Sequence, residues 1–305
     1  MSKPTGAARR GAIRIGISGW RYEPWRGAFY PKDLRQKDEL KYAASVLTSI
    51  EINGTFYSLQ TPDSFKNWAS EVPVDFIFSV KGPQFITHMR RLKNAETALA
   101  NFFASGILRL GPTLGPILWQ LPPNFKFDPE RLESFFKLLP RDTEAMADLA
   151  RLHDKKLKTR AWLKPLTKAR VRHAIEIRHD SFASPGFIEL LRTHDVALVC
   201  ADSPNWPQLM DVTSEFVYCR LHGAEELYAS GYDEKSLQEW ARRVVSWSCG
   251  ESPSGARLAA KPQPGKQSPR DVFVYFDNDA KVCAPRDAQR LRALVEQMKS
   301  KDEMQ

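Results

Sequence analysis

Two short segments of the chain, Ile50–Asn53 and Ile175–Arg178, share one pattern in which a glutamate stands between two isoleucines. Runs of β-branched residues favour strands, and the side chains of a strand point alternately to its two faces. The isoleucines therefore lie on one face, with Glu51 and Glu176 on the other. An unpaired buried charge costs several kcal/mol or more, so these carboxylates need partners. We expect a shared polar interior in which a glutamate acts as a general base.

The elements that position these residues follow from hydrophobic periodicity. The expected strands are Ile13–Ser18, Ser49–Thr55, Asp75–Lys81, Pro116–Leu121, Arg172–Arg178, Ala197–Asp202, Phe216–His222 and Asp271–Asp277. The expected helices are Glu39–Leu47, Asp63–Ser70, Ala95–Leu108, Pro129–Leu138, Pro185–Arg192, Leu237–Trp247 and Pro285–Met298. Alternating strands and helices within 305 residues predict an α/β fold, a (β/α)8 TIM-like barrel in one domain. An open doubly wound sheet is less favoured, because no glycine-rich phosphate-binding sequence follows the first strand.

Three peripheral segments flank or interrupt the barrel, which spans residues 12–299. We expect a disordered basic tail over residues 1–11 and a basic helical insert before the fifth strand over residues 141–170. Residues 250–270 are rich in proline and glycine, and we expect them to form a flexible loop. Residues 1–11, 155–172 and 250–270 carry net charges of +3, +8 and +3, so the rest of the chain is net negative although the formal net charge is +9. Each precedes a strand, so we expect all three on the N-terminal face of the barrel, away from its C-terminal rim.

Barrel enzymes place their chemistry at the C-terminal rim, where each strand ends. Polar side chains with inward alternation stand at that end of every expected strand. For the eighth strand we choose Asn278 over Asp277. The inward set is Ser18, Glu51, Asn53, Ser79, Lys81, Gln120, Glu176, Arg178, Asp202, Tyr218, Arg220, His222 and Asn278. Loops after the first three strands add Trp20, Tyr57 and His88. Each residue also has a purely structural interpretation, as a buried ion pair, a turn cap or a packed ring.

The residue types suggest roles within this ring. Glu51 or Glu176 could be a general base and His222 a general acid, and Lys81 could stabilise negative charge or form a Schiff base. Arg178 and Arg220 suit a carboxylate or phosphate ligand. The remaining candidates for binding a substrate are Ser18, Trp20, Asn53, Tyr57, His88, Gln120, Asp202 and Asn278.

The composition indicates in which cellular compartment the protein is expected. No apolar run approaches the roughly 20 residues of a membrane-spanning helix, and the polar start of the chain does not resemble a signal peptide. The four cysteines have no metal-like spacing. We interpret them as reduced core residues of a cytoplasmic protein. No cofactor and no membrane partner are predicted.

Several strand ends resemble those of the YecE-like family, also called domain of unknown function 72. The matching stretches include Gly16–Trp20, Glu51–Tyr57, Gly115–Pro123, Glu176–Ser181, Arg220–Gly223 and Tyr275–Asp279. The resemblance extends from about Ile13 to Leu294 and implies a TIM-like barrel, but it brings no established activity. The chain departs from the family pattern at Phe182, where we expect a tryptophan, and in the long basic insert.

Three functions remain open from the sequence. The favoured one is an acid–base enzyme, a hydrolase, isomerase or lyase, that acts on an anionic small molecule. A metal-dependent isomerase-like or endonuclease-like barrel is the second, with a divalent ion held by Glu176, Asp202 and His222. Three cations in the same ring weigh against it. The third, a non-catalytic nucleic-acid-binding protein using the basic segments, is not favoured, because those segments are expected opposite the ring.

Overall fold

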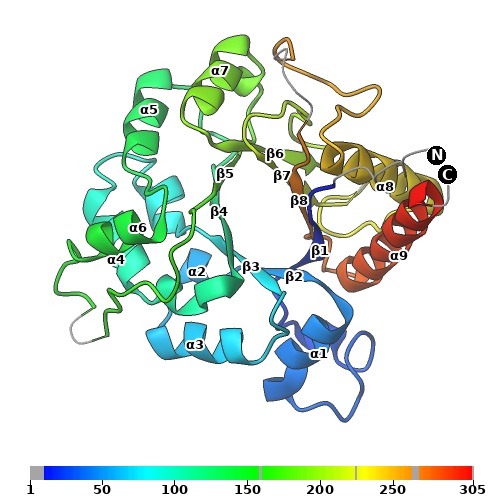
Figure 1. Ribbon diagram of the computed structural model, residues 1–305, viewed down its shortest axis with the longest axis horizontal. Helices are drawn as coiled ribbons and strands as arrows, with labels where there is room; N and C mark the ends of the chain where they lie inside the picture. Colours follow the sequence, from blue (N-terminus) through cyan, green and yellow to red (C-terminus); the bar gives the residue numbers. More distant parts are fainter. Residues whose placement is uncertain (1–9, 158–159, 224, 263–267, 304–305) are drawn as a thin grey trace, which may run out of the picture.

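The computed structural model describes residues 10–157, 160–223, 225–262 and 268–303. Within these ranges, parallel strands β1 to β8 form a barrel in chain order, and β1 pairs with β8 to close it (Figure 1). Helices surround the barrel, as Figure 1 shows. The predicted (β/α)8 TIM-like barrel is confirmed.

The strands are β1 (Ile13–Ser18), β2 (Ser49–Ile52), β3 (Ile77–Lys81), β4 (Leu114–Gln120), β5 (His173–Glu176), β6 (Ala197–Asp202), β7 (Phe216–Leu221) and β8 (Asp271–Phe276). The α-helices are α1 (Glu39–Val46), α2 (Gly54–Tyr57), α3 (Pro62–Ser70), α4 (Glu96–Ala104), α5 (Pro129–Lys137), α6 (Thr143–Ala150), α7 (Pro185–Thr193), α8 (Glu234–Ser248) and α9 (Cys283–Glu303). None of them is long and apolar enough to cross a membrane, within the ranges given above.

Two elements end three or four residues earlier than the sequence indicates. β2 stops at Ile52, because Asn53 already has helical dihedral angles and the next residues form the short helix α2. The helix expected over Ala95–Leu108 ends at Ala104. Gly106 there has a φ of 119°, a left-handed conformation that glycine adopts without steric cost, and a separate 3-10 turn follows.

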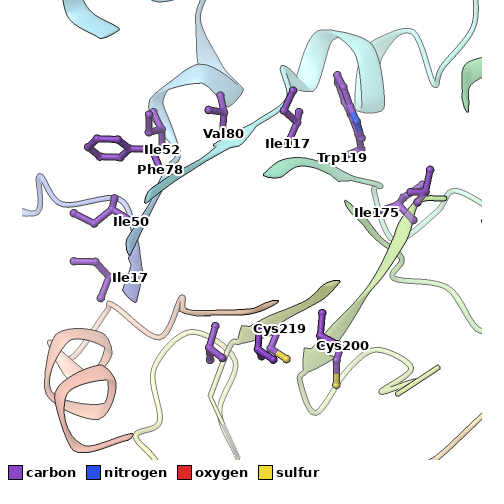
Figure 2. Packing of buried hydrophobic residues seen from close by; sticks show 14 of the residues in the cluster. Ile17, Ile50, Ile52, Phe78, Val80, Ile117, Trp119, Ile175, Cys200 and Cys219 are labelled. Atoms are coloured by element: carbon purple, nitrogen blue, oxygen red, sulfur yellow. The ribbon is translucent and has the colours of Figure 1, made fainter. Parts of the chain in front are cut away.

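Outward strand residues form the main core against the helices. Figure 2 shows Ile50 and Ile52 of β2, and Ile175 of β5, among the side chains that surround the barrel wall. All three are fully buried, which confirms that the isoleucines of the repeated pattern share the helix-facing side.

The interior of the barrel has two layers. The deeper one is mostly apolar, with Leu118, Phe216, Tyr218, Phe273 and Tyr275 among its members. Nearer the C-terminal ends of the strands the interior becomes charged, and this end of the barrel is called the mouth below. The fold thus encloses a polar site above an apolar base.

The basic insert does not stay on the N-terminal face. α6 follows Asp142, which forms an isolated bridge with Arg170 close to the start of β5. Farther along the insert, the Nζ of Lys156 lies 5.8 Å from the centre of the Phe85 ring, in the turn that follows β3. The insert therefore reaches the side of the barrel where the strands end, contrary to the prediction.

The other two peripheral segments lie partly outside the described residues. Of the predicted tail, residues 1–9 are not described, and Gly11 donates its amide proton to the Ser248 carbonyl at 2.9 Å. Of the predicted loop, residues 263–267 are not described. Before them, the amides of Ala259 and Ala260 donate to the carboxylate of Asp211 at 2.8 and 3.0 Å.

Candidate functional site

Arg220 of β7 lies at the centre of the mouth and is fully buried. Its Nη1 donates to Oε2 of Glu176 at 2.6 Å, and its Nη2 donates to Oε1 of Glu51 and Oδ2 of Asp277, each at 2.9 Å. A third donor, Nε, reaches the other oxygen of Glu51 at 3.1 Å. Burial alone lowers the pKa of Arg220, but Asp277, Glu176 and Glu51 outweigh it and raise the pKa well above its usual value. One guanidinium thus joins carboxylates from β2, β5 and the end of β8.

Polar neighbours complete this network. Ser18 at the end of β1 donates to Oε1 of Glu51 at 2.5 Å and accepts from Nη2 of Arg220 at 3.1 Å. Tyr218 donates its hydroxyl to Oε2 of Glu51 at 2.6 Å, and the Oε1 of Gln120 lies 3.4 Å from Nη1 of Arg220. The predicted residues Ser18, Glu51, Gln120, Glu176 and Arg220 therefore meet.

Glu176 binds two arginines in this arrangement, which makes it a poor general base. Its second oxygen, Oε1, accepts from Nε of Arg178 at 2.7 Å. Burial favours a higher pKa for Glu176, but Arg220, Arg178 and His222 hold the pKa well below its usual value. The pKa of Asp277 is lowered in the same way, with Arg220 again the strongest influence opposing burial. A carboxylate with a depressed pKa is a weak general base at neutral pH.

Lys81 at the end of β3 differs from Arg220, because it forms no ion pair with a carboxylate of the described residues. Its side chain is only 7% exposed, and its Nζ lies 4.5 Å from the centre of the Phe56 ring. Burial, followed by the charge of Arg220, lowers the pKa of Lys81 to about 8 despite the nearby carboxylates. The ammonium is therefore available to an anion and can also lose its proton near neutral pH.

Two further predicted residues lie on the same side of the mouth. The Cζ of Arg178 lies 3.8 Å from the centre of the Trp206 ring, a cation–π contact that orients the guanidinium. His88 lies on a π-helical turn (Phe85–Met89), edge-on to Phe56 at 5.1 Å between ring centres. Burial lowers the pKa of His88 to about 4, with Arg178 and Lys81 adding to the shift. Lys81 and Arg178, together with the neutral ring of His88 beside them, are called the cationic side.

His222 follows β7 and is fully buried between two acids. Its Nδ1 lies 3.1 Å from Oδ2 of Asp277, and its Nε2 lies 3.7 Å from Oε2 of Glu176. Neither ring nitrogen has the alignment of a hydrogen bond with any group that the structure describes. The rings of Trp206 and Tyr228 pack edge-on against the imidazole at 5.1 and 5.4 Å between centres. The structure thus brings His222 into the site with a carboxylate beside each of its ring nitrogens.

Another part of the mouth holds polar groups that follow β1, β2 and β8. Tyr22 donates its hydroxyl to the carbonyl of Ser18 at 2.7 Å, and the side chains of Asn53 and Asp279 lie within hydrogen-bonding reach of it. Burial, then the charge of Asp277, raises the pKa of Asp279 to about 6. Tyr22, Asn53 and Asp279 are called the acceptor side. Tyr22 and Asp279 were not among the site residues predicted from the sequence. Asp279 stands two residues after Asp277, so an inward Asp277 would have indicated that Asp279 also faces the mouth.

Two predicted residues do not join the site. Asp202 faces the helices, where its carboxylate accepts from Nε1 of Trp240 at 3.0 Å and from Nε2 of Gln208 at 2.7 Å. Asn278 also faces outward and donates to Oδ2 of Asp287 at 3.1 Å. Ala201 and Asp277, their neighbours in sequence, take the inward positions. The alternation was therefore assigned to the wrong face in β6 and β8.

Two predicted aromatic residues, Trp20 and Tyr57, lie outside the central network. Trp20 is buried in the helix-facing core and packs edge-on against Trp68 at 5.3 Å between ring centres. Tyr57 is 72% exposed at the end of α2 and contacts Phe56 edge-on. Trp20 supports the wall, whereas Tyr57 stands at the rim.

The ligands suggested for a metal ion do not converge. Asp202 lies on the opposite face of the barrel wall from Glu176 and His222. Over the part of the chain that the structure describes, no cluster of three His, Cys, Asp or Glu side chains is arranged to hold a metal ion.

Comparisons with known proteins agree with the fold and the strand-end motifs. The UPF0759 protein YunF of Bacillus subtilis is 26% identical, covering 93% of this chain and 95% of its own. The UPF0759 protein YecE of Escherichia coli is 26% identical over 37% of this chain and 39% of its own. Among solved structures, the DUF72 family protein TM1631 of Thermotoga maritima has a TM-score of 0.69 at 24% identity, covering 93% of this chain and 99% of its own. That of Enterococcus faecalis, EF0366, has a TM-score of 0.63 at 16% identity, covering 93% and 95%.

The model of one protein family, described as protein of unknown function DUF72, matches residues 14–305. The match begins at the second residue of β1 and includes β2 to β8 and the residues of the mouth. The resemblance noted at the strand ends is confirmed, and this chain belongs to the DUF72 family.

Proposed function

We propose that this protein is an acid–base enzyme that acts on an anionic small molecule, a phosphate or carboxylate, at the mouth of the barrel. The observation that supports the proposal best is Lys81, a buried ammonium without a carboxylate partner among the described residues. Leaving such a charge unpaired is costly. An anion bound between Lys81 and Arg178 would offset that cost.

Proton transfer requires a group whose pKa lies near the working pH. Glu176 and Asp277 do not meet this requirement, because their pKa values are depressed. Asp279, with a pKa of about 6, and Lys81, with a pKa of about 8, do meet it. We assign the base to Asp279 and the cationic stabilising group to Lys81.

The binding part of the proposal can be tested by calorimetry with a panel of phosphate and carboxylate compounds. Lys81→Met should weaken binding of the best compound at least about tenfold, because a charge-assisted contact is lost. Lys66→Met on the exposed face of α3 is the matched control and should leave the affinity unchanged. If no compound in the panel binds, or if Lys81→Met binds as well as the wild type, the proposal is wrong.

The catalytic part can be tested with any compound of the panel that is turned over. With ionised Asp279 as base and protonated Lys81 as cation, kcat/KM should rise as pH passes about 6 and fall as pH passes about 8. Asp279→Asn should remove the acidic limb together with most of the activity. A profile that is flat between pH 5 and 9 in the wild type would contradict these assignments.

A further inference from the structure

The two sides of the mouth offer a ligand opposite kinds of contact. The cationic side (Lys81, His88, Arg178) comes from β3, β5 and the turn after β3. The acceptor side (Tyr22, Asn53, Asp279) comes from β2 and the loops after β1 and β8. In the closed barrel, β8, β1 and β2 are consecutive and so are β3, β4 and β5. The two sides therefore occupy different arcs of one rim, which adjoin where β2 pairs with β3 and are separated on the other side by β6 and β7.

The hydrogen bonds of Ser18 determine which way the amide of Asn53 is turned. The single hydroxyl proton of Ser18 goes to Glu51, and its oxygen accepts from Arg220. Ser18 can therefore only accept from Asn53, so the group at 2.8 Å must be the Nδ2 of the amide. The Oδ1 of Asn53 is left as an acceptor.

That acceptor has no partner in the described part of the molecule. Oδ1 of Asn53 is buried and receives no hydrogen bond there. A buried polar atom without a partner destabilises the protein unless a ligand supplies the missing hydrogen bond. Beside it, the carboxyl of Asp279 is half-buried and near the negative charge of Asp277. Both groups are suited to a donor, and both lie beside Tyr22.

We infer that the ligand carries a hydrogen-bond donor, a hydroxyl or an ammonium group, at a position separate from its anionic group. The donor binds to Oδ1 of Asn53 and to the carboxylate of Asp279, while the anion binds to Lys81 and Arg178. This inference rests on the proposed function and adds the chemical class of the substrate. Two classes fit: a phosphorylated or carboxylated polyol, and an amine that also carries an acidic group.

Three phosphate monoesters of similar size separate these cases when their binding is measured by calorimetry. Ethyl phosphate has the anion alone, glycerol 3-phosphate adds hydroxyl groups, and phosphoethanolamine adds an ammonium group. The wild type should bind one of the last two at least about tenfold more tightly than ethyl phosphate. Tighter glycerol 3-phosphate binding indicates a polyol, and tighter phosphoethanolamine binding indicates an amine.

Substitutions on the acceptor side test whether these residues cause the preference over ethyl phosphate. Asn53→Leu should reduce the preference for glycerol 3-phosphate to within about threefold, and Asp279→Asn should do the same for phosphoethanolamine. Neither should change the affinity for ethyl phosphate by more than about twofold. Glu23→Gln, an exposed carboxylate in the loop after β1, is the control and should change nothing. Asp279→Asn is isosteric and removes the charged acceptor that either donor would use, so it should reduce whichever preference the wild type shows and carries the test even if Asn53→Leu does not fold.

The outcomes separate this inference from the proposed function. If ethyl phosphate binds as tightly as the other two esters, the inference is wrong and the proposed anion site stands. A preference that survives in both variants also overturns the inference. If none of the three esters binds to the wild type, the inference is wrong for phosphate esters, and the proposed function is then decided by the carboxylate compounds of the panel.

Discussion

Arg220 and Lys81 are two buried cations at the mouth of one barrel, and their surroundings are opposite. Arg220 donates to three carboxylates, from Glu51, Glu176 and Asp277. Lys81 contacts the ring of Phe56 and forms no ion pair among the described residues. The same carboxylates affect both groups, but only the guanidinium lies within hydrogen-bonding distance of them.

The difference indicates a stabilising role for Arg220 and a ligand-binding role for Lys81. The planar guanidinium has five donors and can join several strands at once, which suits Arg220 to hold the barrel together. The ammonium of Lys81 changes its pKa readily when buried and keeps its donors free. We therefore expect substitutions of Arg220 to change stability, and substitutions of Lys81 to change binding.

Replacing Arg220 should have the largest effect. Arg220→Met leaves Glu51, Glu176 and Asp277 buried without their common partner, and we expect the free energy of unfolding to fall by about 3–5 kcal/mol. Chemical denaturation at pH 7 measures the change. Lys81→Met removes an unpaired charge and should lie within about 1 kcal/mol of the wild type. Equal losses in the two variants would contradict the division of roles.

The second largest effect should be a difference between the wild type and Lys81→Met in how the free energy of unfolding depends on pH. The pKa of Lys81 is about 8 in the folded protein against an ordinary value of 10.5. Between these values the unfolded chain binds more protons, so raising the pH from 8 to 10 favours the folded state at this residue. The wild type should gain about 1–3 kcal/mol relative to Lys81→Met over that window. Parallel stability curves for the two proteins would show that Lys81 is not perturbed by burial.

Asp202 tests whether a strand-end carboxylate outside the ring matters for binding. Asp202→Ala leaves Nε1 of Trp240 without its acceptor, and we expect a loss of about 1–2 kcal/mol in unfolding free energy. Because the carboxylate faces the helices, the affinity for an anionic ester should not change. Thermal unfolding and calorimetry measure the two quantities. Weaker anion binding by a folded Asp202→Ala variant would place Asp202 in the site after all.

The deeper layer of the barrel should give the smallest effect. The hydroxyl of Tyr275 lies 2.6 Å from the Oγ atoms of both Ser49 and Ser79. Tyr275→Phe removes these contacts and should cost about 1 kcal/mol of stability. Anion affinity, measured by calorimetry, should stay within about twofold of the wild type, because the change lies below the charged network. A larger loss of affinity would show that the two layers are coupled.

Much of the ring could be predicted because several strands have clear alternation. In β2 and β5 the isoleucines mark the helix-facing side, so Glu51 and Glu176 can only face inward. Arg220 and His222 follow from the same alternation in β7.

Two strands misled the prediction because both of their faces are apolar. In β6, the alternatives were Ala197, Val199 and Ala201 on one face, and Leu198 and Cys200 on the other. The smaller side chains of β6 lie inside the closed barrel, which turns Asp202 outward. In β8 the inward rings of Phe273 and Tyr275 likewise leave Asp277, and not Asn278, at the mouth.

By itself, then, the sequence determined that eight strands form a barrel and that opposite charges gather where the strands end. Only the tertiary structure decided which cation the carboxylates contact. Strand alternation places a side chain on a face but says nothing of distances across the barrel. Those distances bring three carboxylates to Arg220 and leave Lys81 available for a ligand.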